Sequence, residues 1–170
     1  MASERKKHRP LPLVALLMAW LVPGAGHVYL GRTVRGVIIF VTISATFWAG
    51  VGIGGVMTAD YQNERWWFMA EMFAGVHGLV AWHRHNQVQN KVLGGEAMRE
   101  RLSLAQADQK LQEEGVFLPY PSDTVARAYA GVAGLLNLLC AFDAVVLAMM
   151  GATGEPPRTL SRRGPAEAEA

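Results

Sequence analysis

The stretch GVIIFVTISATFWAGVGIGGVM, residues 36–57, decides the fold class of this chain. It holds no charged residue, and its 22 residues form a helix of about 33 Å, enough to cross a hydrocarbon core of about 30 Å. Gly50 and Gly54 are spaced four apart inside it, a pattern that lets a second helix approach closely. The alternative is that glycine is simply frequent in membrane helices.

The composition of the whole chain agrees with a membrane protein. Of the 170 residues, 51% are hydrophobic and only 18% are charged, and a second uncharged run lies between Leu11 and Gly31. This excludes an ordinary soluble domain and a disordered chain. The net charge of +2 gives no sign of nucleic-acid binding, and the single cysteine, Cys140, excludes an internal disulfide. We therefore expect an all-α, polytopic integral membrane protein with three or four membrane helices and a helical polar loop.

The first apolar segment leaves two structures open. Residues 11–22 make a helix of only about 18 Å, and Pro23-Gly24 then kinks or ends it. The segment is either a kinked full span reaching Leu30 or a re-entrant half-span. A cleaved signal peptide is disfavoured because no Ala-x-Ala site is present and another hydrophobic run follows at once. Residues 11–57 are thus expected to form a helical hairpin with a Gly-rich turn at 23–31.

Two further apolar segments are expected to be membrane helices. Residues 66–82 are bounded by tryptophans, which favour the membrane interface, and reach about 26 Å. Residues 126–150 form the last span and contain Ala130 and Gly134, another pair of small residues four apart.

The remaining segments are polar. Residues 83–125 form a loop in which Glu96–Glu114 is expected to be helical, with a thin apolar stripe of Met98, Leu102, Ala105 and Leu111. That stripe either stays solvated or lies on a membrane or partner. Residues 1–10 form a basic tail, and residues 151–170 are expected to be disordered.

The distribution of Lys and Arg bears on the topology. Four spans place eight basic residues on each side, so the positive-inside rule does not distinguish the two orientations. A re-entrant first segment changes the count to twelve against four and places the basic tail and the polar loop together in the cytoplasm. This second arrangement is favoured.

The turn carries a signature, PGAGHVYLGR at residues 23–32, followed by Arg35-Gly36. It resembles the two-transmembrane-helix domain family and related small bacterial membrane proteins of unknown function. The resemblance implies a multi-pass protein of the bacterial inner membrane. That family often carries an Asp in a later apolar helix, and Asp143 stands in such a helix here.

The turn residues also have a physical interpretation. Glycines permit positive φ and close backbone approach, a tyrosine suits the interface, and an arginine can reach phosphates while its stem stays apolar. A packed helical-hairpin turn is the first interpretation, and a lipid head-group site is the alternative. The residues concerned are Pro23, Gly24, Gly26, His27, Tyr29, Gly31 and Arg32.

Polar groups inside the apolar segments are candidates for function. A charge in mid-bilayer costs at least about 2.5–3.5 kcal/mol, so such groups usually face the protein interior or water. If the third and fourth segments are antiparallel spans, Glu71 and Asp143 lie at similar depth, as do His77 and Asn137. Two nearby carboxylates suggest proton or cation binding. The alternative is local hydrogen bonding or snorkelling.

No residue pattern indicates an enzyme, a cofactor or a metal. His83 and His85 fall on different helix faces, and no nucleophile elbow or phosphate-binding loop is present. We therefore expect a non-enzymatic structural or interaction subunit in the lipid bilayer, without nucleic acid. Its partner would be another membrane protein or a second copy of the chain, contacted through Gly50 and Gly54 or through Ala130 and Gly134, or a soluble protein at residues 83–121. The alternative is a small transporter or channel subunit using Glu71, His77, Asn137 and Asp143.

Overall fold

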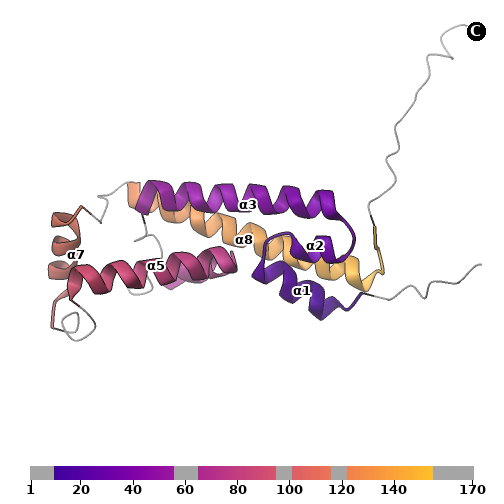
Figure 1. The fold of residues 1–170 in the computed structure, drawn as a ribbon, viewed down its shortest axis with the longest axis horizontal. Coiled ribbons are helices and arrows are strands. Elements are labelled where there is room, and N and C mark those ends of the chain that lie inside the picture. Colours follow the sequence, from indigo (N-terminus) through magenta and orange to yellow (C-terminus); the bar gives the residue numbers. More distant parts are fainter. Residues whose placement is uncertain (1–9, 56–64, 95–100, 116–121, 155–170) are drawn as a thin grey trace, which may run out of the picture.

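The computed structural model describes residues 10–55, 65–94, 101–115 and 122–154. The helices of these ranges form one elongated bundle, and no strand occurs among them (Figure 1). Their bounds are α1 Pro12–Leu21, α2 Ala25–Tyr29, α3 Thr33–Gly54, α4 Arg65–Met72, α5 Val76–Leu93, α7 Leu104–Glu113 and α8 Ser122–Met149. The predicted tails lie almost wholly outside the described residues.

Helices α3 and α8 form the long antiparallel pair at the centre of the bundle (Figure 1). Near one end Arg35 of α3 pairs with Asp143 of α8, and near the other end Gly50 lies against Ala126 and Ala130. These are the two described helices that are long and apolar enough to cross a membrane. The sequence thus predicted both of these long elements.

The first segment turns back on itself. Helix α1 has only 10 residues and ends before Pro23, and the short α2 then returns to the end from which α1 started. Two contacts tie that end together: the Leu11 amide donates to the Tyr29 hydroxyl at 3.3 Å, and the Gly154 amide donates to the Leu30 carbonyl at 2.9 Å. We call α1 and α2 the N-terminal hairpin and this end the Pro10 end. Of the two predicted alternatives, the structure has the chain reversal of the re-entrant one.

The third apolar segment is not one helix. Residues 73–75 break it into α4 and α5, and Gly75 takes a φ of +64° there. Helix α4 runs parallel to α8, because Trp67 lies against Gly131, Ala70 against Gly134, and Phe73 bonds to Asn137. Helix α5 then runs back beside α4, with Gly78 against Glu71. The predicted helix over 66–82 is therefore a second helical hairpin, here called the central hairpin.

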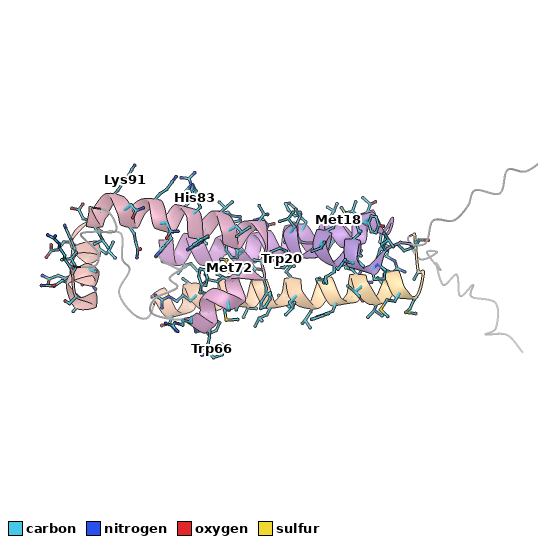
Figure 2. All side chains as sticks on the ribbon, turned by 90° about the horizontal axis from the view of Figure 1, so that it is seen from below. Met18, Trp20, Trp66, Met72, His83 and Lys91 are labelled. Carbon is cyan, nitrogen blue, oxygen red and sulfur yellow. The ribbon has the colours of Figure 1, made fainter. Side chains whose placement is uncertain are left out.

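The two hairpins enter the bundle from opposite ends. Figure 1 shows the N-terminal hairpin at the Pro10 end and α5 extending toward the other end, where α7 lies. In Figure 2, Trp20 of α1 and Met72 of α4 lie close to each other in the middle of the bundle. The favoured topology placed the start of the chain and the polar loop on one side, but the break at residues 73–75 puts Pro10 and α7 at opposite ends.

The far end of α5 and the helix α7 form a polar extension beyond the ends of α3 and α8 (Figure 1). Helix α7 begins after Ser103, which forms a capping box with Gln106. Leu111 of the predicted apolar stripe is buried against Leu93, so this part of the stripe packs within the chain. The predicted helix started at Glu96. Residues 96–100 lie outside the described residues, and residues 101–103 are not helical, so the described helix begins only at Leu104.

The bundle buries small and polar side chains and exposes large apolar ones. Among the described residues, eleven of the seventeen buried hydrophobic side chains are alanines, whereas the outward faces carry Val, Ile, Leu, Phe and Trp. Only 22% of the most apolar 18-residue window of α3, and 33% of that of α8, is buried. This distribution is the reverse of the one expected for the core helices of a soluble protein.

Candidate functional site

Asn137 lies where the two hairpins meet. It is fully buried, close to the middle of α8. Its Nδ2 lies 3.2 Å from the Ala19 carbonyl oxygen, 3.4 Å from that of Trp20 and 2.9 Å from that of Phe73. One side chain thus binds the carboxyl ends of both α1 and α4.

The chemistry of this junction requires a donor. Carbonyls in the last turn of a helix have no partner within the helix, and they carry the negative end of its dipole. Three carbonyl oxygens can only accept, so the side-chain atom among them is the amide nitrogen. An ion-binding protein could place a cation among such oxygens, whereas here the Asn137 amide occupies this position.

A second polar cluster lies nearer the Pro10 end. The His27 Nε2 donates to the Asp143 carboxylate at 2.8 Å, and the Arg35 Nη2 lies 3.0 Å from the same oxygen. His27 is fully buried, while Arg35 and Asp143 are roughly half exposed. Gly26 makes room for this arrangement, because a Cβ there would overlap the Ala15 carbonyl and the Ala19 side chain. The cluster joins α2, α3 and α8.

His77 forms a third, separate site at the start of α5. Trp48 Nε1 donates to His77 Nδ1 at 3.3 Å, so in the neutral ring Nε2 carries the proton and donates to Ser44 Oγ at 2.9 Å. The rings of Phe40 and Phe47 lie 5.9 Å from the imidazole, centroid to centroid. These contacts fix α5 against α3.

Glu71 and Asp143 do not come together. Glu71 is fully buried in the last turn of α4, and its neighbour Ala70 lies against Gly134. Gly134 and Asp143 are nine residues apart on α8, about 13 Å along the helix. The similar depth predicted for the two carboxylates assumed a third span antiparallel to α8, whereas α4 runs parallel to it.

The pairs of small residues serve packing inside the chain. A Cβ at Gly50 would press on the Ala126 carbonyl and the Ala130 amide, and one at Gly134 would overlap the Ala70 carbonyl. Gly54 is also buried. The hypothesis that these faces receive another subunit is therefore not supported, because α3, α4 and α8 already occupy them.

The turn motif builds the N-terminal hairpin. Pro23 is fully buried, Gly24 and Gly31 have φ of +80° and +77°, and Tyr29 caps the start of α1 through its hydroxyl. A Cβ at Gly24 would overlap the Gly36 carbonyl oxygen, so only glycine fits there. Arg32 is the residue before α3. These contacts agree with the first interpretation of this motif, a packed turn, except that residues 25–29 of the predicted turn form the helix α2.

Several residues of the three sites could not be found from the sequence. Arg35 stands out only as part of the signature, and nothing in the sequence marks Ser44, Trp48 and Gly75 as partners. Each of these residues lies inside or beside an apolar run, so the sequence gives little sign of its role. The carbonyls that bind Asn137 belong to apolar residues and give no sign at all. Within residues 10–55, 65–94, 101–115 and 122–154, no three His, Cys, Asp or Glu side chains are grouped to hold a metal ion.

The cluster around Asp143 leads to a prediction about stability. Asp143→Leu is expected to lower the free energy of unfolding by about 2 kcal/mol, because it leaves the buried His27 N–H without an acceptor. Arg35→Met should cost less than about 1 kcal/mol, since that pair is half exposed. Unfolding in mixed micelles measures both variants. If the two variants lowered the free energy of unfolding equally, His27 would not be the dominant partner of Asp143.

A comparison with protein families adds one finding. A model described as a family of unknown function (DUF6677) matches residues 14–157, which include most of α1 and each described helix from α2 to α8. No curated protein and no solved structure matches the chain. The resemblance to the two-transmembrane-helix domain family rests on the turn motif alone. From the extent of the match, the chain belongs to the family of unknown function DUF6677.

Proposed function

We propose that this chain is a multi-pass integral membrane protein. In this proposal α3 and α8 cross the bilayer, and the two hairpins enter it from opposite sides and meet at Asn137. The observation that carries the proposal is the exposed apolar surface of α3 and α8, in contrast to their small and polar interior. In water, leaving one Leu or Phe exposed forgoes about 1.5–3 kcal/mol, whereas lipid tails solvate such side chains.

The broken helices support the same proposal. Irregular backbone at membrane depth is tolerated only where protein or a water-filled cavity satisfies its polar groups. The chain reverses near mid-depth at residues 22–24 and 73–75, and Asn137 binds carbonyls beside both breaks. Asn137 is therefore the residue that allows two half-spans to end inside the bilayer.

The proposed role is a non-enzymatic interaction subunit. The polar extension stands clear of α3 and α8, and it has its own small core of Leu93 and Leu111 (Figure 1). The outward face of α5 presents exposed polar side chains, and Figure 2 shows His83 and Lys91 pointing outward from this helix. This polar surface, attached to the membrane helices, could bind a soluble protein. Acidic side chains of that partner would pair with Arg84 and Lys91.

The alternative of a transporter or channel subunit receives less support. It requires Glu71, His77, Asn137 and Asp143 to share one pathway. His77 instead binds Ser44 and Trp48, Asn137 binds helix carbonyls, and Asp143 binds His27 and Arg35. These contacts favour helix packing over a common route for a solute.

The role is tested by crosslinking and by flux. A photoreactive residue at Gln87 on the extension should trap one soluble protein of defined mass in cells, and Arg84→Glu with Lys91→Glu should abolish the product. The same residue at Leu139, which is 65% exposed on α8, serves as the control and should not trap that protein. Proton or cation flux in proteoliposomes, lost in Asp143→Asn, together with no product at Gln87, would instead identify the transporter.

A further inference from the structure

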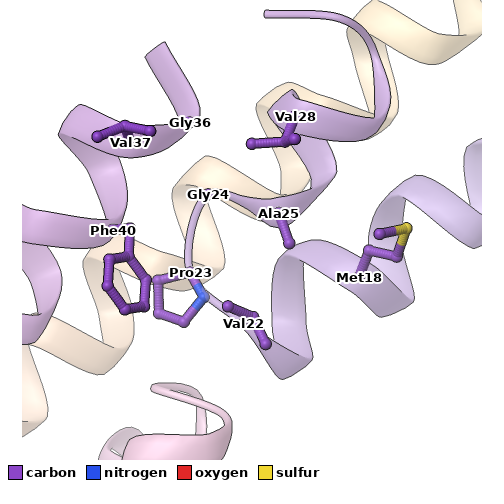
Figure 3. A pocket seen from close by; sticks show the side chains of 9 residues that line it. All are labelled: Met18, Val22, Pro23, Gly24, Ala25, Val28, Gly36, Val37 and Phe40. Atoms are coloured by element: carbon purple, nitrogen blue, oxygen red, sulfur yellow. The ribbon is translucent and has the colours of Figure 1, made fainter. Parts of the chain in front are cut away.

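An open apolar groove lies between the N-terminal hairpin and α3 (Figure 3). Its volume is about 220 Å³. Met18, Val22 and Pro23 line the hairpin wall, and Val37 and Phe40 line the α3 wall. No lining residue has a polar side chain. Such a surface suits an apolar ligand.

The groove owes its shape to two glycines. Gly24 and Gly36 line it without side chains, and they bring the turn so close to α3 that a Cβ on Gly24 would overlap the Gly36 carbonyl. From this contact the groove extends along α3 to Phe40, one turn deeper than Gly36. The groove therefore extends along α3 for about one helical turn.

Two arginines stand at the start of α3, next in sequence to the shallow end of the groove. Arg35 immediately precedes the lining residue Gly36, and Arg32 stands just before α3. Asp143 binds one nitrogen of Arg35, whose side chain is 48% exposed, so further guanidinium donors face outward. Within the described residues the buried Arg32 Nε has no partner. The first turn of α3 contains no acidic residue, and its dipole adds positive potential.

We propose that the groove binds one acyl chain of an anionic phospholipid whose phosphate lies at Arg32 and Arg35. This inference rests on the proposed membrane location and assigns a ligand to the turn motif. Two positive side chains beside one carboxylate complement a phosphate, and the apolar walls complement a hydrocarbon chain. A stable protein interface needs about 20–30 residues on each side, whereas nine residues line this groove. The size of the groove thus favours a lipid chain over a helix.

Lipid binding to the purified full-length protein tests the proposal by native mass spectrometry. The probes are dioleoyl phosphatidylglycerol, dioleoyl phosphatidylcholine with the same chains, and inorganic phosphate. Ala25→Leu fills the groove and should weaken both lipids about tenfold, the effect of displacing about two methylene groups. Ala45→Leu, on an exposed face of α3 outside the groove, is the matched control and should change neither.

A second substitution tests whether the arginines bind the lipid head group. Arg32→Gln should weaken phosphatidylglycerol about fivefold and phosphatidylcholine by less, because the choline cation offsets the charge of the phosphate that the two lipids share. Unchanged lipid binding in a folded Ala25→Leu variant would overturn the proposal. Complete displacement of the lipid by inorganic phosphate would also overturn the proposal. A protein dimer that is dissociated only by Ala25→Leu would overturn it as well. A protein that is not inserted in membranes would instead refute the proposed function, and cysteine labelling detects that outcome separately.

Discussion

Replacing Asn137 with leucine is expected to lower the free energy of unfolding by about 3 kcal/mol. Leucine has a similar volume but no donor, so the carbonyls of Ala19, Trp20 and Phe73 lose their partner in the middle of the bundle. A buried polar group left without a partner costs about 1–3 kcal/mol, and hydrogen bonds between membrane helices average about 0.6 kcal/mol. Unfolding in mixed micelles gives the difference from wild type.

Two further variants separate the hydrogen bonds from packing. Asn137→Asp preserves the shape but, when ionised, brings acceptors against three acceptors, and it should be at least as destabilising as leucine. Leu139→Ala, two residues along α8 with a largely exposed side chain, should change stability by less than about 0.5 kcal/mol. If Asn137→Leu behaved like Leu139→Ala, the junction would not depend on Asn137.

The second large effect is expected at Gly134. A Cβ there overlaps the Ala70 carbonyl oxygen, an atom of backbone held in α4, so the two helices must separate. Gly134→Ala should lower the free energy of unfolding by about 2 kcal/mol, the usual cost of overpacking a close contact. The same measurement in mixed micelles tests it.

Gly52 supplies the matched control for that substitution. It lies on α3, where an added Cβ would meet nothing within 4 Å. Gly52→Ala therefore adds only helix propensity and should be neutral or stabilising by up to about 1 kcal/mol. Equal effects at the two glycines would contradict the close packing of α4 on α8.

The sequence predicted the long helices because local signals specify them, and it left the reversal at Pro23-Gly24 as one of two alternatives. Residues 36–57 are too long and too apolar for another element, and Pro23-Gly24 follows an apolar run too short to span. The proline supplies a fixed φ and the glycine a positive one, so the reversal is specified by the residues themselves.

The central hairpin could not be predicted in the same way. Residues 66–82 contain no proline, and the break at Gly75 looks like an isolated glycine in an apolar helix. What favours the break is tertiary: the Trp20 and Leu21 carbonyls occupy the space of a Cβ at Gly75, and Asn137 binds the Phe73 carbonyl. The α1 carbonyls and Asn137 are both distant from Gly75 in the sequence, and neither produces a hydrophobic periodicity that would predict the break.

In the candidate site, too, the sequence indicated some residues but not the residues that they contact. Asn137 and Asp143 stood out because polar residues inside apolar helices are rare and usually functional or structural. Their partners could not be identified, since depth arithmetic requires the direction of each helix, and the break at Gly75 reverses the direction of the chain. His27 stood out only as part of the turn motif, although it bonds to Asp143 from 116 residues away.

Single-cysteine labelling tests the opposed hairpins most directly. In a Cys140→Ser background, cysteines are placed one at a time at three exposed positions, Thr33, Asn90 and Thr153. Intact and permeabilised cells are then treated with a membrane-impermeant maleimide. Two opposed hairpins predict that Thr33 and Thr153 react from one side and Asn90 from the other. Labelling of Thr33 and Asn90 from the same side, with Thr153 opposite, would show that the central segment crosses the membrane and would contradict the opposed arrangement.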